Sequence, residues 1–173
     1  SQITILRVVD KPVINPVFPC ALDESIQDEP VQFPKQTQIN LRQIETEVIN
    51  QVNDFREKNG LNRLTVSNLL MKTAAVKGRY LIEYDLFDHH PNYIGLDKWF
   101  ADYFDSLPPP IPMAGAENLA AGYRNAKEVV EAWIKSKGHR ENMVNTNWQE
   151  IGVFVGMNKK RMLTVLHMGG VTK

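Results

Sequence analysis

The sequence predicts one α+β domain in which helices cover a mainly antiparallel sheet. Apolar residues recur at spacings of three and four through long stretches before residue 140, which is typical of helices. Nearer the end of the chain, apolar residues alternate with others, which is typical of strands. Because helices come first and a strand pair comes last, we expect an antiparallel sheet with helices on its faces. The 173 residues, 43% of them hydrophobic, are enough to bury one continuous core.

Residues 1–37 are predicted to form an N-terminal arm, and residues 38–173 the domain proper. Each proline fixes its own φ angle and removes a backbone donor, so a proline-rich segment is expected to be extended and irregular. Segment 3–9 is rich in β-branched residues and predicts either an added edge strand or a loosely docked arm. Cys20 is the sole cysteine, so an internal disulfide is excluded and a small packed side chain is expected. Five of the ten prolines lie in this arm: Pro12, Pro16, Pro19, Pro30 and Pro34.

Two long amphipathic helices are predicted in the first half of the domain. The first begins near Gln38 and ends at Asn59-Gly60, because glycine supplies the left-handed conformation common at helix ends. The second runs from about Ser67 to Tyr84, and its alanine-rich centre suits close packing.

Shorter elements are predicted in the second half. A short helix spans 97–104, and the prolines of 108–112 end it. Asn125 and Glu128 resemble a capping box that opens a helix, and Gly138 is expected to close it. Apolar residues alternate with other residues over 151–155 and again over 163–167, and a polar turn separates the two segments. This pattern predicts two strands of a hairpin.

Composition excludes some partners. Basic and acidic residues both number 20, so there is no excess positive charge to attract nucleic acid. The chain has no run of 18 apolar residues, so a membrane-spanning segment is not expected. Its start lacks the pattern of a signal peptide, which a mature exported fragment would also lack.

Four titratable residues stand at the predicted ends of elements, where side chains can converge on a cleft: His89, Glu117, Glu128 and His139. Two imidazoles and two carboxylates are ligands that zinc accepts. Strong local signatures, namely HExxH, a Cys-x-x-Cys pair or a Walker loop, are missing. No Gly-x-Ser-x-Gly turn marks a nucleophile, so any catalysis would use water activated by a metal or by a Glu/His pair.

Each of these residues also has a simpler explanation. Glu128 could serve only the capping box, and His139 could favour the negative end of a helix. Glu117-Asn118 could form a turn, and His89-His90 could be solvated loop residues. The residues alone leave both interpretations open.

Several segments, taken in order, resemble the CAP superfamily of cysteine-rich secretory, antigen 5 and pathogenesis-related proteins, in its compact bacterial form. They are VINQVNDFREKNGL at 48–61, FDH at 87–89, AENLA at 116–120, EVVEAW at 128–133, and GHRENM at 138–143 followed by EIGV at 150–153. The resemblance covers residues 44–170. It departs at Ala116, where the family usually has glycine, and at Asp88, where it usually has serine.

The resemblance implies a three-layer α-β-α sandwich whose cleft holds a His-Glu-Glu-His tetrad, in some members occupied by zinc. Carried over by motif position, the tetrad is His89, Glu117, Glu128 and His139, with His89 and His139 as the expected metal ligands. Secondary candidates from the same motifs are His90, Asn118, Asn142 and Glu150.

The function implied by the resemblance is that of a secreted or cell-surface bacterial module that binds a small-molecule, lipid or protein ligand without rapid turnover. Four aromatic residues either line a lipid groove or pack in the core: Trp99, Phe100, Tyr103 and Phe104. One alternative is a zinc-assisted hydrolase with Glu117 or Glu128 as the base. Another is a structural surface module whose tetrad supports the fold.

Overall fold

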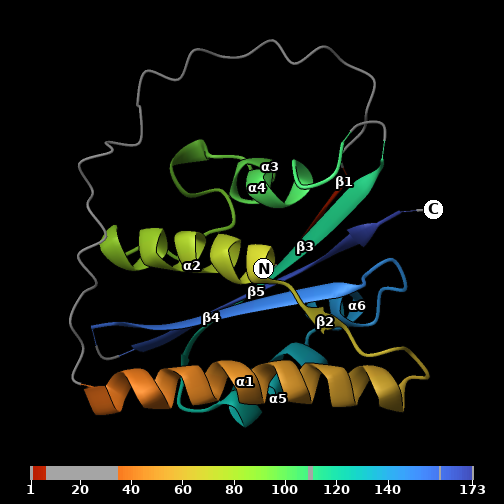
Figure 1. The fold of residues 1–173 in the computed structure, drawn as a ribbon. Coiled ribbons are helices and arrows are strands. Elements are labelled where there is room, and N and C mark those ends of the chain that lie inside the picture. The colour runs from red at the N-terminus through yellow and green to blue at the C-terminus, as the bar shows by residue number, and fades with distance from the viewer. Residues whose placement is uncertain (1, 7–34, 109–110, 160, 173) are drawn as a thin grey trace.

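The computed structural model describes residues 2–6, 35–108, 111–159 and 161–172, and it contains a five-stranded sheet (Figure 1). The strand order is β1-β3-β5-β4-β2, and every neighbouring pair is antiparallel except the short parallel pair β2 and β4. The predicted α+β class is therefore confirmed, with a mixed edge. The strands are β1 (Gln2–Leu6), β2 (Thr65–Val66), β3 (Met113–Tyr123), β4 (Glu150–Asn158) and β5 (Arg161–Val171).

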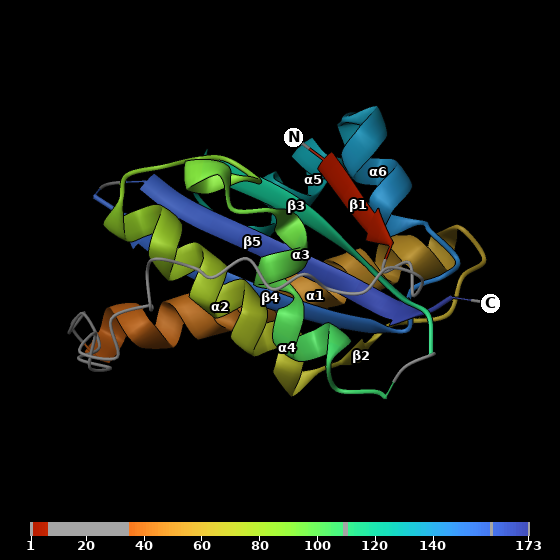
Figure 2. The ribbon, with the colours of Figure 1, turned by 90° about the horizontal axis from the view of Figure 1, so that it is seen from above.

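Helices cover both faces of the sheet, which gives three layers (Figures 1 and 2). One face carries α1 (Lys35–Lys58), α5 (Ala126–Lys135) and α6 (Lys137–Met143). The other carries α2 (Asn68–Glu83), α3 (Leu96–Trp99) and α4 (Ala101–Phe104), with the 3₁₀ turn η1 (Pro91–Tyr93) between α2 and α3. We call these the α1 face and the α2 face.

Both long helices were predicted correctly. Helix α1 buries Val48 and Val52 completely and is followed by Gly60, whose φ of +73° is left-handed. Helix α2 begins after Ser67, whose hydroxyl accepts a hydrogen bond from the N–H of Leu70. The hairpin of β4 and β5 was also predicted correctly.

Three predictions about the elements were wrong in detail. Glu117-Asn118, for which a turn was one interpretation, lies within β3, an inner strand that the sequence did not predict. Pairing with β1 and β5 overrides the weak local strand preference of residues 113–123. Helix α5 ends at Lys135, since Ser136 adopts an extended conformation, so Gly138 lies inside α6 and does not close α5. Residues 97–104 form two short helices, α3 and α4, divided at Phe100.

The predicted N-terminal arm, residues 1–37, is described only at its two ends. Residues 35–37 are the first residues of α1, so the helix begins before the predicted boundary. Residues 2–6 form β1, which pairs with β3 at the edge of the sheet. The prolines from Pro12 to Pro34, and Cys20, lie outside the described residues, so the predictions about them stay predictions.

Alternation along β3 divides the side chains between the two faces. Leu119 packs with Ala74 and Leu81 of α2, whereas Ala120 belongs to the core cluster under α1 and α5. Since successive strand residues point to opposite faces, Glu117 lies on the α2 face and Asn118 on the α1 face. This division decides which candidate residues can meet.

Glycine allows the α2 layer to lie unusually close to the sheet. A Cβ atom on Gly152 would stand 2.2 Å from the carbonyl carbon of Leu70, and one on Gly115 would stand 2.6 Å from the Phe100 ring. Bare backbone at these positions therefore allows α2 to lie against β4, and the Phe100 ring between α3 and α4 to lie against β3.

Among the helices that the structure describes, none is long and apolar enough to cross a bilayer.

Candidate functional site

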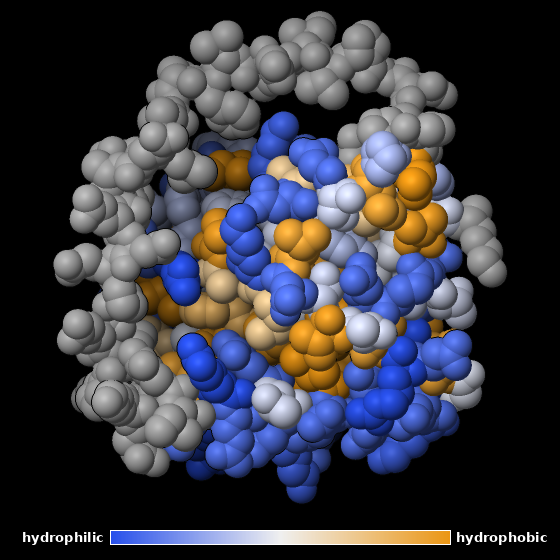
Figure 3. Space-filling view, in the orientation of Figure 1, coloured by the Kyte–Doolittle hydropathy of each residue, from blue (hydrophilic) through white to orange (hydrophobic). Residues whose placement is uncertain are grey.

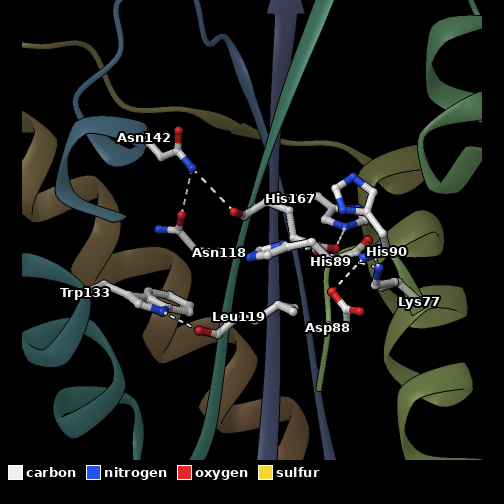
Figure 4. Close-up of polar contacts among 10 residues, drawn as sticks. Lys77, Asp88, His89, His90, Asn118, Leu119, Trp133, Asn142 and His167 are labelled. Atoms are coloured by element: carbon white, nitrogen blue, oxygen red, sulfur yellow. Dashed lines mark hydrogen bonds and ion pairs between the residues drawn. The ribbon is translucent and has the colours of Figure 1, made fainter. Parts of the chain in front are cut away.

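Glu117 is the centre of a buried polar cluster on the α2 face. Figure 4 labels its neighbours Lys77, His89 and His167. The side chain of Glu117 is fully buried, yet both carboxylate oxygens have partners. The Nδ1 atom of His89 lies 2.6 Å from Oε1, and the Nε2 atom of His167 lies 2.8 Å from Oε2. One carboxylate thus joins a loop histidine to a strand histidine.

The sheet and α2 together fix the position of His167. His167 is the register partner of Glu117, so the two side chains leave adjacent strands on the same face. The second ring nitrogen, Nδ1, lies 2.9 Å from the Thr73 hydroxyl of α2. The ring of Phe100 stacks on the imidazole at a centroid distance of 4.2 Å. His167 therefore has both nitrogens engaged and one face covered.

Lys77 brings the opposite charge into this cluster. Its side chain is fully buried one turn after Thr73 on α2. The ammonium group donates to the backbone carbonyl of His89 at 2.6 Å and lies 3.7 Å from Oε1 of Glu117. It also stands 4.7 Å from the centroid of the Trp99 ring, a cation–π contact. We call Thr73, Lys77, His89, Glu117 and His167 the Glu117 cluster.

Opposing effects set the charges of the Glu117 cluster. Burial alone would raise the pKa of Glu117, but hydrogen bonds from His167 and His89 and the charge of Lys77 lower it to about 2. Burial lowers the pKa of His167, which favours the neutral ring, although Glu117 opposes this shift. Burial also lowers the pKa of Lys77 to about 8, against the attraction of Glu117 and Asp88. At neutral pH the cluster contains one carboxylate and, predominantly, one ammonium.

The structure does not bring the four residues of the expected tetrad together. His89 and Glu117 meet on the α2 face, whereas Glu128 and His139 belong to α5 and α6 on the α1 face. Glu128 accepts from the backbone N–H of Arg124 at 3.0 Å and pairs with its guanidinium. The ring of His139 lies 6.4 Å from that of Trp133. The sheet therefore separates the tetrad into two pairs.

Glu128 lies next to a helix cap. The side chain of Asn125 accepts a hydrogen bond from the N–H of Glu128 at 2.9 Å, as a helix cap does. The Glu128 carboxylate accepts from the backbone N–H of Arg124, one residue before the cap. These contacts fit the capping interpretation, and a ligand-binding role for Glu128 stays a prediction. The guanidinium and backbone of Arg124 lower the pKa of Glu128. His139 does lie beyond the C-terminus of α5, as expected, but it is in the first turn of a second helix, α6.

The choice between the two adjacent histidines is clear in the structure. His89 is 3% exposed and reaches Glu117, whereas His90 is exposed and its backbone N–H donates to Asp88. In the part of the chain that the structure describes, Nε2 of His89 is buried without a hydrogen-bond partner.

The other secondary candidates serve different contacts. Asn142 donates from Nδ2 to the side-chain oxygen of Asn118 at 2.9 Å (Figure 4). Asn118 in turn donates to the carbonyl of His139 at 3.2 Å. These bonds join α6 to β3 on the α1 face. Glu150, at the start of β4, accepts a hydrogen bond from the Tyr103 hydroxyl at 2.7 Å.

Sequence reasoning missed Thr73, Lys77 and His167. His167 was recognised as a residue of the last strand, but not as a site residue. A signal for Lys77 did exist, because a lysine stands on the apolar stripe of α2 between Ala74 and Leu81. A charge on the buried stripe of a helix requires a partner.

An open hollow lies elsewhere on the molecule, beside the N-terminal end of α2. Its volume is about 330 Å³, and it is open to solvent. Figure 3 shows apolar surface on this side of the molecule, where β3 begins and β5 ends. The lining residues are Ser67, Leu69, Tyr103, Ser106, Leu107, Met113, Gln149, Glu150, Gly170 and Val171.

The aromatic residues expected near a lipid groove mainly pack in the core. Phe100, Tyr103 and Phe104 are buried with Leu70 and Leu96, and Trp99 is partly buried against this cluster. Among them, Tyr103 also borders the open hollow.

The element order, and the His89–Glu117 pair between the loop after α2 and β3, define a CAP-type sandwich domain. The model of the cysteine-rich secretory protein family (CAP) matches residues 49–167, and the chain belongs to this family. The resemblance seen in the sequence is thereby confirmed.

Bacterial proteins are among its relatives. The chain is 36% identical over 109 residues to the uncharacterized protein YkwD of Bacillus subtilis, covering 63% of this chain and 41% of that protein. It is 28% identical over 116 residues to the uncharacterized membrane protein YlbC of the same species, covering 67% of this chain and 32% of that protein. The chain thus spans less than half the length of these relatives.

Solved structures share the fold. An outer surface protein of Borrelia burgdorferi superposes with a TM-score of 0.66 at 23% identity, over 75% of this chain and 94% of that one. An extracellular protein of Bacillus anthracis that contains an SCP domain also gives 0.66, at 18% identity, over 82% of this chain and 44% of that one.

Proposed function

We propose that this chain is an extracytoplasmic binding domain of a bacterial protein and that it performs no turnover. Membership of the family supports the location, as do similar folds in an outer surface protein and an extracellular protein. The absence of turnover depends on one observation, which is the burial of the Glu117 cluster.

A catalytic base must be within hydrogen-bond reach of a proton on the substrate. The side chains of Glu117 and His167 are 0% exposed and that of His89 is 4% exposed. Both oxygens of Glu117 and both ring nitrogens of His167 already contact protein atoms. The cluster therefore supports the α2 face and the loop around His89, and ligand binding belongs to a different surface.

The open hollow beside α2 is the surface we assign to ligand binding. Leu69, Leu107 and Val171 supply apolar wall, and Glu150 supplies a carboxylate at its edge. Because a mostly apolar hollow with one acidic group matches a molecule with an apolar chain and a cationic head, we propose an amphipathic amine as the ligand class.

The test is a titration of ¹⁵N-labelled protein with octylamine, octanol and octanoate, followed by amide chemical shifts. We expect octylamine to shift residues that line the hollow and to bind at least about tenfold more tightly than octanoate, as one favourable charge contact predicts. Glu150→Gln keeps an acceptor for the Tyr103 hydroxyl but removes the charge, so it should abolish the preference for the amine.

Leu107→Asp should weaken binding of all three probes, because it places a charge on the apolar wall. The matched control is Val76→Asp, since Val76 is 45% exposed on α2 and lies outside the hollow. Equal shifts with octylamine and octanoate, or shifts scattered over the surface, would refute the assignment of the hollow.

The zinc-assisted hydrolase receives less support. It requires His89 and His139 at a common metal ion, and the sheet lies between them. Cleavage of a fluorogenic peptide by the zinc-supplemented protein, abolished in Glu117→Gln, would establish the hydrolase and overturn the proposal of no turnover.

A further inference from the structure

The family implies a zinc ion in some members, so the Glu117 cluster must be tested for its fit to a metal. Within the described residues, no three His, Cys, Asp or Glu side chains are arranged to hold a metal ion. The reason lies in the cluster itself, which already contains a cation. We propose that the ammonium group of Lys77 takes the role of the metal ion in this site, so that His89, Glu117 and His167 form a charge-balanced cluster that excludes zinc.

Charge balance is the first argument. The cluster holds one carboxylate, Glu117, and one ammonium, Lys77, both fully buried. A divalent ion added to this pair would bring the net charge of the buried groups to +2 (+1 − 1 + 2 = +2). Asp88 attracts Lys77 but is exposed to solvent, and Glu128 is on the far side of the sheet, so neither places a second anion inside the cluster. Uncompensated charge in a buried site is strongly unfavourable.

The second argument concerns the lone pairs that a metal would need. Glu117 accepts on Oε1 from His89 and on Oε2 from His167. His167 is held on its other nitrogen by Thr73. Of the ring nitrogens in the cluster, Nε2 of His89 alone has no partner among the described residues. While these hydrogen bonds hold, one nitrogen is too few, since zinc sites use three or four protein ligands. A metal must therefore displace both hydrogen bonds to Glu117, and only a site without the Lys77 charge allows this exchange.

The third argument is that Lys77 is fixed as firmly as a bound ion would be. The ammonium group donates to the His89 carbonyl at 2.6 Å and stands 3.7 Å from Oε1 of Glu117. The Trp99 ring lies 4.7 Å away and adds a cation–π contact. Lys77 thus links helix, loop and strand through one positive charge. This inference deepens the proposed supporting role of the cluster and rests on it.

The experiment compares zinc binding by the wild-type chain, Lys77→Met and Lys72→Met. Lys72 is the matched control, because it is also on α2 but is 63% exposed and pairs with Asp102 at the surface. The probe is zinc chloride. Its binding is measured by calorimetry, and its effect on the midpoint of thermal unfolding is measured with and without EDTA.

We expect the wild-type chain and Lys72→Met to show no zinc-dependent shift. Lys77→Met should gain a zinc site, with a midpoint raised by about 5 °C or more at saturating zinc and restored by EDTA. Adding His167→Gln to Lys77→Met should remove the gain, which places the new site in the cluster.

Two results would overturn the inference. One is zinc binding by the wild-type chain that His167→Gln abolishes. The other is a folded Lys77→Met protein that does not bind zinc and whose unfolding midpoint does not change with zinc. If Lys77→Met is unfolded in EDTA, refolding upon addition of zinc supports the inference, and failure to refold in zinc overturns it. None of these results alters the octylamine titration, so the proposed binding function is judged separately.

Discussion

Glu117 and His167 are direct partners across strands β3 and β5, and their side chains meet at 2.8 Å in a fully buried site. This pair joins the sheet to α2 through Thr73 and to the loop after α2 through His89. Its stability depends on Lys77, because the carboxylate would otherwise be a buried charge without an opposite charge.

Glu117→Gln should strongly destabilise the domain. The amide has nearly the same shape, but it leaves the Lys77 ammonium buried without an anion, a loss of about 3–5 kcal/mol for a broken buried pair. Urea denaturation followed by circular dichroism measures the effect. The control is Glu128→Gln, whose exposed pair with Arg124 should cost less than about 1 kcal/mol. Equal losses in the two variants would contradict the assigned role of Glu117.

Stability should fall in acid because of Glu117. Its pKa is about 2 in the folded protein, below the ordinary value of 4.5, so the unfolded chain binds a proton first as the pH falls. The stabilisation by this carboxylate is fully present above pH 4.5 and is lost as the pH falls from 4.5 toward 2. Urea denaturation at a series of pH values should show the free energy of unfolding decreasing over this range. In Glu117→Gln the free energy of unfolding should depend much less on pH. If Glu117→Gln shows the same pH dependence of the free energy of unfolding as the wild type, other groups cause the loss of stability in acid.

Gly152→Ala should disrupt the contact between α2 and β4. The new methyl group would stand 2.2 Å from the carbonyl carbon of Leu70, and backbone cannot turn aside as a side chain can. We expect a loss of about 3 kcal/mol, at the upper end of overpacking costs. Gly156→Ala is the control, because its nearest neighbours are side-chain atoms of Ile82 and Phe154. The midpoint of thermal unfolding should be well below that of Gly156→Ala in the Gly152→Ala variant.

Arg56→Lys should weaken the junction between α1 and the segment after α6. The guanidinium of Arg56, 2% exposed, donates to the carbonyls of Asn62, Met143 and Asn145. A lysine cannot reproduce this fork, so a loss of about 1.5–3 kcal/mol is expected from hydrogen bonds of a charged group. Arg63→Lys is the matched surface change, since Arg63 is 41% exposed, and it should cost less than about 1 kcal/mol. Chemical denaturation of both variants tests this difference.

Much of the fold could be predicted from local pattern. The apolar stripe of α1, the stripe and alanine-rich centre of α2, and the alternation of apolar residues in β4 and β5 are short-range signals, and each led to the correct element. Strand β3 could not be recognised in this way. Its residues include several alanines and glycines, and its conformation is imposed by pairing with β1 and β5.

The candidate site was predicted in part for the same reason. Motif order identified His89 and Glu117, and the structure joins them at 2.6 Å. Glu128 and His139 were grouped with them because both stood near element ends, but side-chain direction depends on which face each element covers. Whether any of the four serves a ligand or a metal stays a prediction.

The sequence by itself determined the class of fold, the two long helices and the family. Periodicity, capping and motif order can be recognised from residues that are close together in the sequence. Only the tertiary structure decided that Glu117 meets Lys77 and His167, since strand register and the close approach of α2 at Gly152 bring together residues that are distant along the chain. A buried carboxylate needs a partner whose identity depends on packing, and local spacing does not encode it.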